Sequence, residues 1–159
     1  MIAIGSLVRR SGFVCTENGM EENIKLFSRL REEGCSILVF PEGTRSEDCS
    51  ILKFKSGAFS LAGELGMDVL PIVLFGPGEV LPKGEHILRR GKVIVEVKDR
   101  VTVSSLETYG PRPLKQAQAF RRYYEDEYAN LKDKAYSDAS FKASRIKDNN
   151  LYKSEDEMV

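Results

Sequence analysis

The chain has no excess of charge of either sign, because Lys plus Arg and Asp plus Glu both total 24 in its 159 residues. A balanced chain has no general attraction for nucleic acid, so no nucleic-acid partner is expected. The chain also lacks the roughly 18 uninterrupted apolar residues that a membrane-spanning helix needs. Its first residues do not follow the order of a secretory signal peptide. These absences favour a single-domain protein of the cytoplasm.

Cysteine and histidine are scarce. The three cysteines, Cys15, Cys35 and Cys49, have no metal-ligand spacing, and a single histidine, His86, cannot complete a zinc site. No metal is therefore expected. The cysteines are interpreted as reduced thiols, with Cys15 and Cys35 acting as small core residues.

What the sequence does contain is an alternation of helical and strand patterns. Helical patterns cover 2–10, 20–34 and 56–66, and short apolar runs of strand type cover 12–15, 36–40, 69–75 and 92–97. The run SILVF, 36–40, is apolar on both faces, as in a buried parallel strand. Pro71 marks a strand end, an edge or a bulge. The order predicts an α/β domain over 1–112, with a mostly parallel mixed sheet flanked by helices.

The composition changes at Pro113. Apolar residues then recur every three or four positions up to Ala135, which predicts a long amphipathic helix over 113–136. Either the apolar stripe of this helix packs on its own domain, or it is a docking surface for a further part of a larger chain or for a membrane. Residues 137–159 are polar and are predicted to form a mobile tail.

The stretch FPEGTRS, directly after SILVF, carries the chemistry of a binding site. Gly43 allows a tight turn or a close approach to a ligand, Arg45 offers a fork of donors suited to phosphate, and Thr44 adds a hydroxyl. Glu42 can accept hydrogen bonds from a polyol or orient the arginine. Ligands of parallel sheets gather at such strand ends.

Residues downstream of the loop add to the same interpretation. Lys53 and Lys55 bring positive charge, and the helix that opens at Ser56 and Gly57 presents amides that favour an anion. Together they predict a site for a phosphate-bearing ligand. The alternative is a Glu42–Arg45 pair that only braces a turn.

FPEGTRS, followed by FKSGAF and then VLPIVLF, resembles the glycerolipid acyltransferases, the glycerol-3-phosphate and 1-acylglycerol-3-phosphate acyltransferase superfamily. The resemblance runs from about residue 5 to residue 100. It implies that the acyl acceptor, a lipid or other phosphate-bearing molecule, is bound by Phe40, Pro41, Glu42, Gly43, Thr44 and Arg45. It also implies an acyl thioester donor, acyl-coenzyme A or acyl-carrier protein, as co-substrate with no cofactor. Peripheral contact with the inner face of the membrane is expected of such a protein.

The chain departs from the family pattern in an earlier block of the form Gly-x-x-Phe-Ile-Asp-Arg. The corresponding stretch runs from Gly12 to Asn18, where Glu17 stands at the aspartate and Asn18 replaces the cation. This replacement weakens phosphate binding from that side, or indicates an acceptor other than glycerol phosphate.

A second departure concerns the family's His-x-x-x-x-Asp motif, whose histidine takes the proton of the attacking hydroxyl. The only histidine, His86, follows the binding block and has Gly91 five residues later, so it is interpreted as a surface loop residue. Either the chain is part of a longer acyltransferase with that motif upstream of Met1, or it is a non-catalytic binding module for a phospholipid or phosphate ester. An unrelated nucleotide or sugar-phosphate domain is a third, weaker hypothesis. The chain alone is predicted to be inactive.

Overall fold

The structure is a computed structural model that describes residues 19–138, and the chain falls into two units, Met1–Leu38 and Val39–Val159. The predicted helix 2–10, the predicted strand 12–15 and the Gly12–Asn18 block lie outside the described residues. So does the predicted tail from residue 139 onward.

In the first unit, the predicted helix is confirmed as α2, Met20–Glu32, with acidic residues in its first turn and arginines in its last. That order complements the helix dipole. Gly34 follows with φ of 79°, a conformation that favours glycine and ends the helix as predicted. Cys35 is exposed, which contradicts its assignment to the core. The backbone N–H of Cys35 donates to Leu30 O at 2.8 Å, so this residue belongs to the turn that closes the helix.

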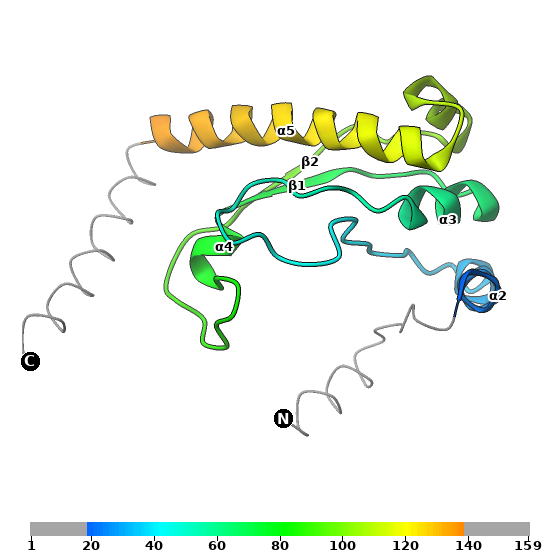
Figure 1. Cartoon of the computed structure of the whole chain (residues 1–159), viewed down its shortest axis with the longest axis horizontal. Helices are drawn as coiled ribbons and strands as arrows, with labels where there is room; N and C mark the ends of the chain where they lie inside the picture. Colours follow the sequence, from blue (N-terminus) through cyan, green and yellow to red (C-terminus); the bar gives the residue numbers. More distant parts are fainter. Residues whose placement is uncertain (1–18, 139–159) are drawn as a thin grey trace, which may run out of the picture. The chain divides into compact units, whose positions relative to one another are not determined.

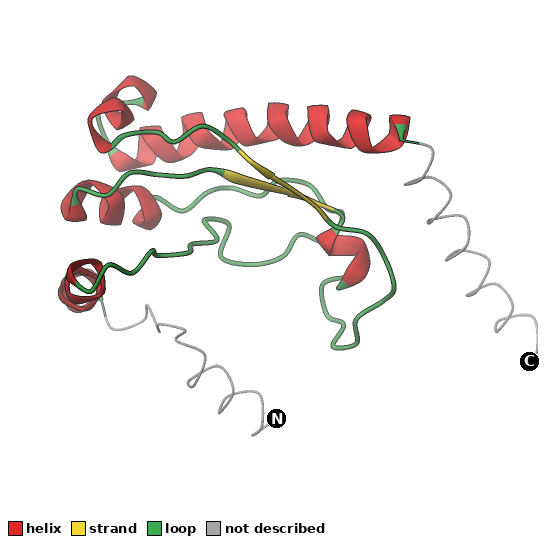
Figure 2. Cartoon of the chain, turned by 180° about the vertical axis from the view of Figure 1, so that it is seen from behind, coloured by secondary structure: helices red, strands yellow, loops and turns green. Residues whose placement is uncertain are grey.

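The second unit contains the remaining elements (Figure 1). These are α3 (Gly57–Leu65), β1 (Ile72–Phe75), α4 (Pro77–Val80), β2 (Ile94–Val97), the 3₁₀ helix η1 (Val103–Tyr109) and α5 (Pro113–Ser137). Figure 2 shows how much of the chain between them is irregular. The predicted helices at 56–66 and 113–136 are confirmed as α3 and α5.

The sheet differs from the prediction. Among the described residues it has two strands, β1 and β2, and they pair antiparallel, with Ile72 opposite Val97 and Phe75 opposite Ile94. The expectation of a mostly parallel sheet is therefore wrong. The chain between the strands contains only the short α4 and several turns, so it returns as a wide hairpin and not as a helical crossover. Pro71 immediately precedes β1, which confirms its position at a strand end.

The run 36–40 does not form the predicted buried strand. Leu38 is 73% exposed and Phe40 is 64% exposed, and no described strand pairs with this segment. An apolar run becomes a strand only where neighbouring strands accept and donate its backbone hydrogen bonds. Without such a neighbour in the described structure, the segment is extended and irregular.

The core of the second unit lies along α5, whose first half packs on α3 and η1 and whose second half packs on β1 (Figure 1). One cluster contains Phe54, Phe59, Ala62, Leu106, Ala117 and Phe120. A second contains Val73, Phe75, Leu131 and Ala135. Tyr124 borders both, and its hydroxyl accepts a hydrogen bond of 3.1 Å from Ile72 N at the start of β1. The predicted stripe of α5 thus packs on its own domain.

Candidate functional site

The predicted binding loop, Phe40–Arg45, begins with a tight turn. Gly43 N donates to Phe40 O at 3.0 Å, and Gly43 has φ of 70°, which few residues other than glycine adopt without strain. Gly43, Thr44 and Arg45 are exposed, whereas Pro41 and Glu42 are half-buried. The loop therefore turns its polar half toward solvent.

Residues 52–55 hold the loop from the side. The backbone N–H of Leu52 donates to Glu42 Oε2 at 2.8 Å, and Lys55 N donates to Pro41 O at 2.8 Å. A half-buried carboxylate that accepts a backbone N–H fixes two segments of chain relative to each other. Glu42 thus has a bracing contact, but its partner is Leu52 and not Arg45.

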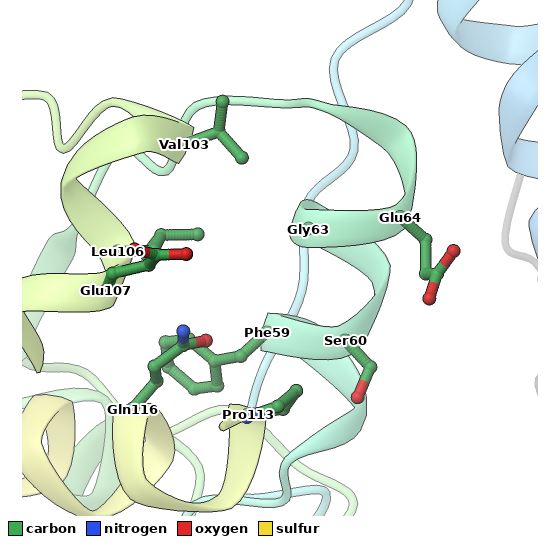
Figure 3. A pocket seen from close by; sticks show the side chains of 9 residues that line it. All are labelled: Phe59, Ser60, Gly63, Glu64, Val103, Leu106, Glu107, Pro113 and Gln116. Carbon is green, nitrogen blue, oxygen red and sulfur yellow. The ribbon is translucent and has the colours of Figure 1, made fainter. Parts of the chain in front are cut away.

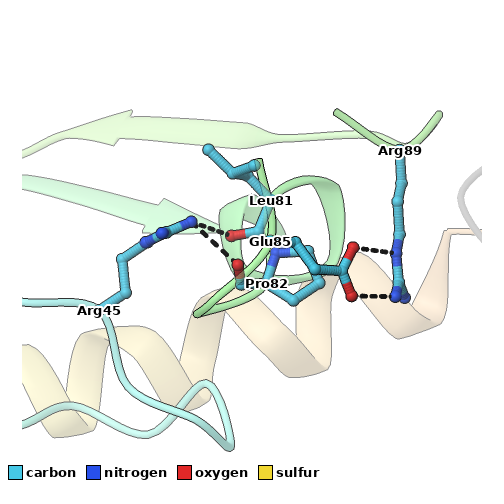
Figure 4. A network of polar contacts seen from close by, with 5 residues as sticks. All are labelled: Arg45, Leu81, Pro82, Glu85 and Arg89. Atoms are coloured by element: carbon cyan, nitrogen blue, oxygen red, sulfur yellow. Dashed lines mark hydrogen bonds and ion pairs between the residues drawn. The ribbon is translucent and has the colours of Figure 1, made fainter. Parts of the chain in front are cut away.

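Arg45 reaches a segment far along the chain. Its Nη1 donates to Leu81 O at 3.0 Å and to Pro82 O at 2.9 Å, just after α4 (Figure 4). An ion pair of 3.3 Å between Lys83 Nζ and Glu47 Oε1 joins the same two segments. The predicted binding loop is therefore fastened to the chain that follows α4. The predicted alternative, a Glu42–Arg45 pair, does not occur among the described contacts.

Lys55 lies over Gly43. A Cβ atom added to Gly43 would stand 2.7 Å from Lys55 Nζ and 2.8 Å from its Cε, so the absence of a side chain leaves the room that Lys55 occupies. No described carboxylate forms an ion pair with Lys55. Helix α3 begins at Gly57, two residues later. The loop thus combines the Arg45 guanidinium, the Lys55 ammonium and a helix N-terminus within a short length of chain.

His86 is exposed in the irregular segment between α4 and β2, which confirms its assignment to a surface loop. Glu17 and Asn18, the two residues that depart from the family's earlier block, lie outside the described residues.

A shallow hollow of about 340 Å³ lies between α3, η1 and α5 (Figure 3). Phe59 and Gln116 point into it, while Glu64 points outward from α3. The buried Gln116 amide donates to Gly110 O at 3.1 Å, so its polar group is satisfied by the protein itself. None of the residues 40–45 lines this hollow.

The comparison with protein families finds a similarity to acyltransferases. Residues 2–75 match the sequence profile described as Acyltransferase. A 1-acyl-sn-glycerol-3-phosphate acyltransferase from Chlamydomonas reinhardtii is 41% identical over 97 residues, which cover 60% of this chain and 27% of that protein. A protein of the same name from Haemophilus influenzae is 36% identical over 80 residues, covering 50% and 32%.

A solved structure agrees with these matches. The 1-acyl-sn-glycerophosphate acyltransferase PlsC from Thermotoga maritima superimposes with a TM-score of 0.60 at 26% identity, over 72% of this chain and 44% of that one. The chain thus spans about a quarter to a third of the two curated relatives named. The profile, the relatives and the fold agree with the motif at Phe40–Arg45, and over residues 2–75 the chain is similar to the acyltransferases.

Proposed function

We propose that this chain contributes the acceptor-binding part of an O-acyltransferase whose acceptor is lysophosphatidic acid or a closely related phosphate ester. The observation that carries the proposal is the FPEGTRS loop in a chain whose residues 2–75 match the acyltransferase profile. The relatives named 1-acyl-sn-glycerol-3-phosphate acyltransferase supply the acceptor class. An acyl thioester, of coenzyme A or of a carrier protein, is the donor, and no metal or other cofactor takes part.

In this reaction the acceptor's hydroxyl oxygen attacks the thioester carbonyl. The new C–O ester bond forms, the C–S bond breaks, and the thiol leaves with the proton that a base has removed from the hydroxyl. Binding the acceptor's anionic group at a fixed place positions the hydroxyl for attack. We assign that binding to residues 40–45.

The contacts of Arg45 indicate how it can fasten the loop and still bind the acceptor's phosphate. Nη1 of Arg45 is used by Leu81 O and Pro82 O, and no described residue accepts from its Nε or Nη2. That second edge of the guanidinium is the one that binds two oxygens of a phosphate at once. Lys55 adds a second cation above Gly43. The phosphate is held between these two groups, and Thr44 supplies a hydroxyl at the same exposed turn.

Binding of a short-chain lysophosphatidic acid to the 159-residue chain, measured by calorimetry, tests the assignment. Removing a charge-assisted contact costs about 1.5–3 kcal/mol, so Lys55→Gln is expected to weaken binding by about tenfold or more. Lys132→Gln removes an exposed lysine on α5 and serves as the matched control. Equal weakening by both variants, or no binding by the unaltered chain, would contradict the assignment.

Catalysis by this chain alone is not proposed. Its one histidine is exposed in a loop and is followed five residues later by Gly91, not by an aspartate. Thiol release from acyl-coenzyme A is therefore expected to stay at background with the isolated chain. Release above background that Glu42→Ala abolishes would show that this expectation is wrong.

The missing His-x-x-x-x-Asp motif also favours a second candidate, a module that binds a phospholipid or phosphate ester without turning it over. The two functions differ in one observable. A His-x-x-x-x-Asp sequence in the same reading frame upstream of Met1 supports the acyltransferase. Lysophosphatidic acid binding with a stop codon there supports the binding module.

A further inference from the structure

The segment between α4 and β2 exposes two adjacent apolar side chains. Ile87 is 80% exposed and Leu88 is 70% exposed. They lie in a loop that we define as the 83–92 loop. Large apolar side chains exposed singly are normal on protein surfaces, but an adjacent pair leaves a concentrated apolar surface in water.

Positive charge surrounds the pair. The 83–92 loop contains Lys83, Arg89, Arg90 and Lys92 but one carboxylate, Glu85. Glu85 is bound by Arg89, with a hydrogen bond of 2.9 Å from Nε to Oε2 and an ion pair at Nη2 (Figure 4). The acidic group of the loop is thereby neutralised. Arg90, next in sequence, forms no ion pair with a described residue.

The loop is fastened at its base. Arg89 N donates to Val80 O at 2.7 Å, which closes the loop across its two arms. Arg45 holds Leu81 O and Pro82 O from the side, and Lys83 is paired with Glu47. The apolar pair is therefore presented by a braced loop.

We propose that the 83–92 loop docks this protein on an anionic lipid surface. Ile87 and Leu88 enter the headgroup region, and Arg90 faces the lipid phosphates. Apolar burial and attraction to anionic lipid are the two terms that hold a protein at an interface. No helix in the described part of the chain has the length and apolar character needed to cross a bilayer.

The inference does not depend on acyl transfer, although it complements it. Arg45 binds Leu81 O and Pro82 O, directly before the docking loop, so a docked loop would bring the proposed acceptor site to the surface where lipid acceptors lie. Vesicles of phosphatidylcholine and phosphatidylglycerol, without any lysophospholipid, test docking separately from acceptor binding.

The chain has no tryptophan, so a single one reports on its own surroundings. Leu88→Trp in the full chain is expected to show a blue-shifted emission on adding anionic vesicles, and quenching by brominated lipid. Leu114→Trp, at a half-exposed leucine of α5, is the matched control and is expected to show neither. No shift at position 88, or equal shifts at both positions, would overturn the proposal.

Sedimentation with the same vesicles measures the partition coefficient of the protein between water and membrane. Ile87→Ser with Leu88→Ser is expected to lower the partition coefficient at least about tenfold, and Arg90→Gln about fivefold at low salt. Leu70→Ser with Leu114→Ser removes two other exposed leucines and is expected to change it less than twofold. Equal loss in the two double variants, salt-independent binding, or self-association that the Ile87 and Leu88 changes abolish would each overturn docking on anionic lipid.

Discussion

Gly76 lies between the end of β1 at Phe75 and the start of α4 at Pro77, and replacing it with alanine should strongly destabilise the second unit. It is buried, and its φ is 97°. A Cβ atom there would stand 2.2 Å from the backbone oxygen of Lys92, which precedes β2. The obstacle is backbone, so no side chain can rotate away to relieve it.

Two costs add at this position. A non-glycine residue in a left-handed conformation costs about 1–2 kcal/mol. Relief of the contact requires Lys92 to move away, which pulls apart the last pair of the sheet, Phe75 with Ile94. Overpacking of this kind costs about 1–3 kcal/mol. The expected loss is about 2–5 kcal/mol, a large part of the roughly 5–15 kcal/mol that stabilises an ordinary domain.

Urea unfolding of a three-variant series measures this loss. Gly66→Ala has the left-handed φ of 59° but nothing within 4 Å of its Cβ, so it should cost only about 1 kcal/mol. Gly63→Ala lies inside α3 with open space around it and should stabilise by about 0.5–1 kcal/mol. A loss for Gly76→Ala no larger than that for Gly66→Ala would refute the role of the Lys92 contact.

Three further predictions concern α5. Burial raises the pKa of Tyr128 to about 12, above the ordinary value of 10. The phenol's contribution to the free energy of unfolding is therefore fully present below pH 10 and is lost as the pH rises from about 10 to 12. In Tyr128→Phe the free energy of unfolding should fall less steeply between these pH values. The difference in slope should be less than about 1.4 kcal/mol per pH unit, because the phenol is partly exposed. Phe120→Ala, at a side chain 2% exposed, should cost about 3–5 kcal/mol in urea unfolding. Tyr124→Phe removes the acceptor of Ile72 N and should cost about 1–3 kcal/mol, with faster amide exchange at Ile72.

The helices were predictable because their signals are local. The acidic first turn of α2, the apolar spacing of each helix and the glycines after α2 and α3 are signals within the segment itself. Strand pairing is not local. The apolar run 36–40 looks the same whether or not a neighbouring strand exists, and only the turn-rich segment 76–91 gave a sign that β1 and β2 form a hairpin.

The same contrast between local signals and long-range contacts holds for the predicted site. Turn chemistry at Gly43 followed from the sequence, and so did the proximity of Lys55 to the loop. The partners of Glu42 and Arg45 did not, because Leu52 and Leu81 carry no side-chain signal for a hydrogen bond made through their backbone. A contact to a main-chain atom 36 residues away has no residue-type pattern to find.

The two edges of the Arg45 guanidinium lead to a final prediction. Nη1 fastens the chain directly before the 83–92 loop through Leu81 O and Pro82 O, and no described residue accepts from the edge formed by Nε and Nη2. Lysine keeps the charge but has one ammonium, which cannot serve both edges at once. Arg45→Lys should therefore weaken lysophosphatidic acid binding and also speed amide exchange at Glu85, whose N–H donates to Pro82 O. Lys55→Gln should weaken binding alone. If Arg45→Lys changes exchange but not binding, Arg45 is a fastening residue, and the phosphate is held elsewhere.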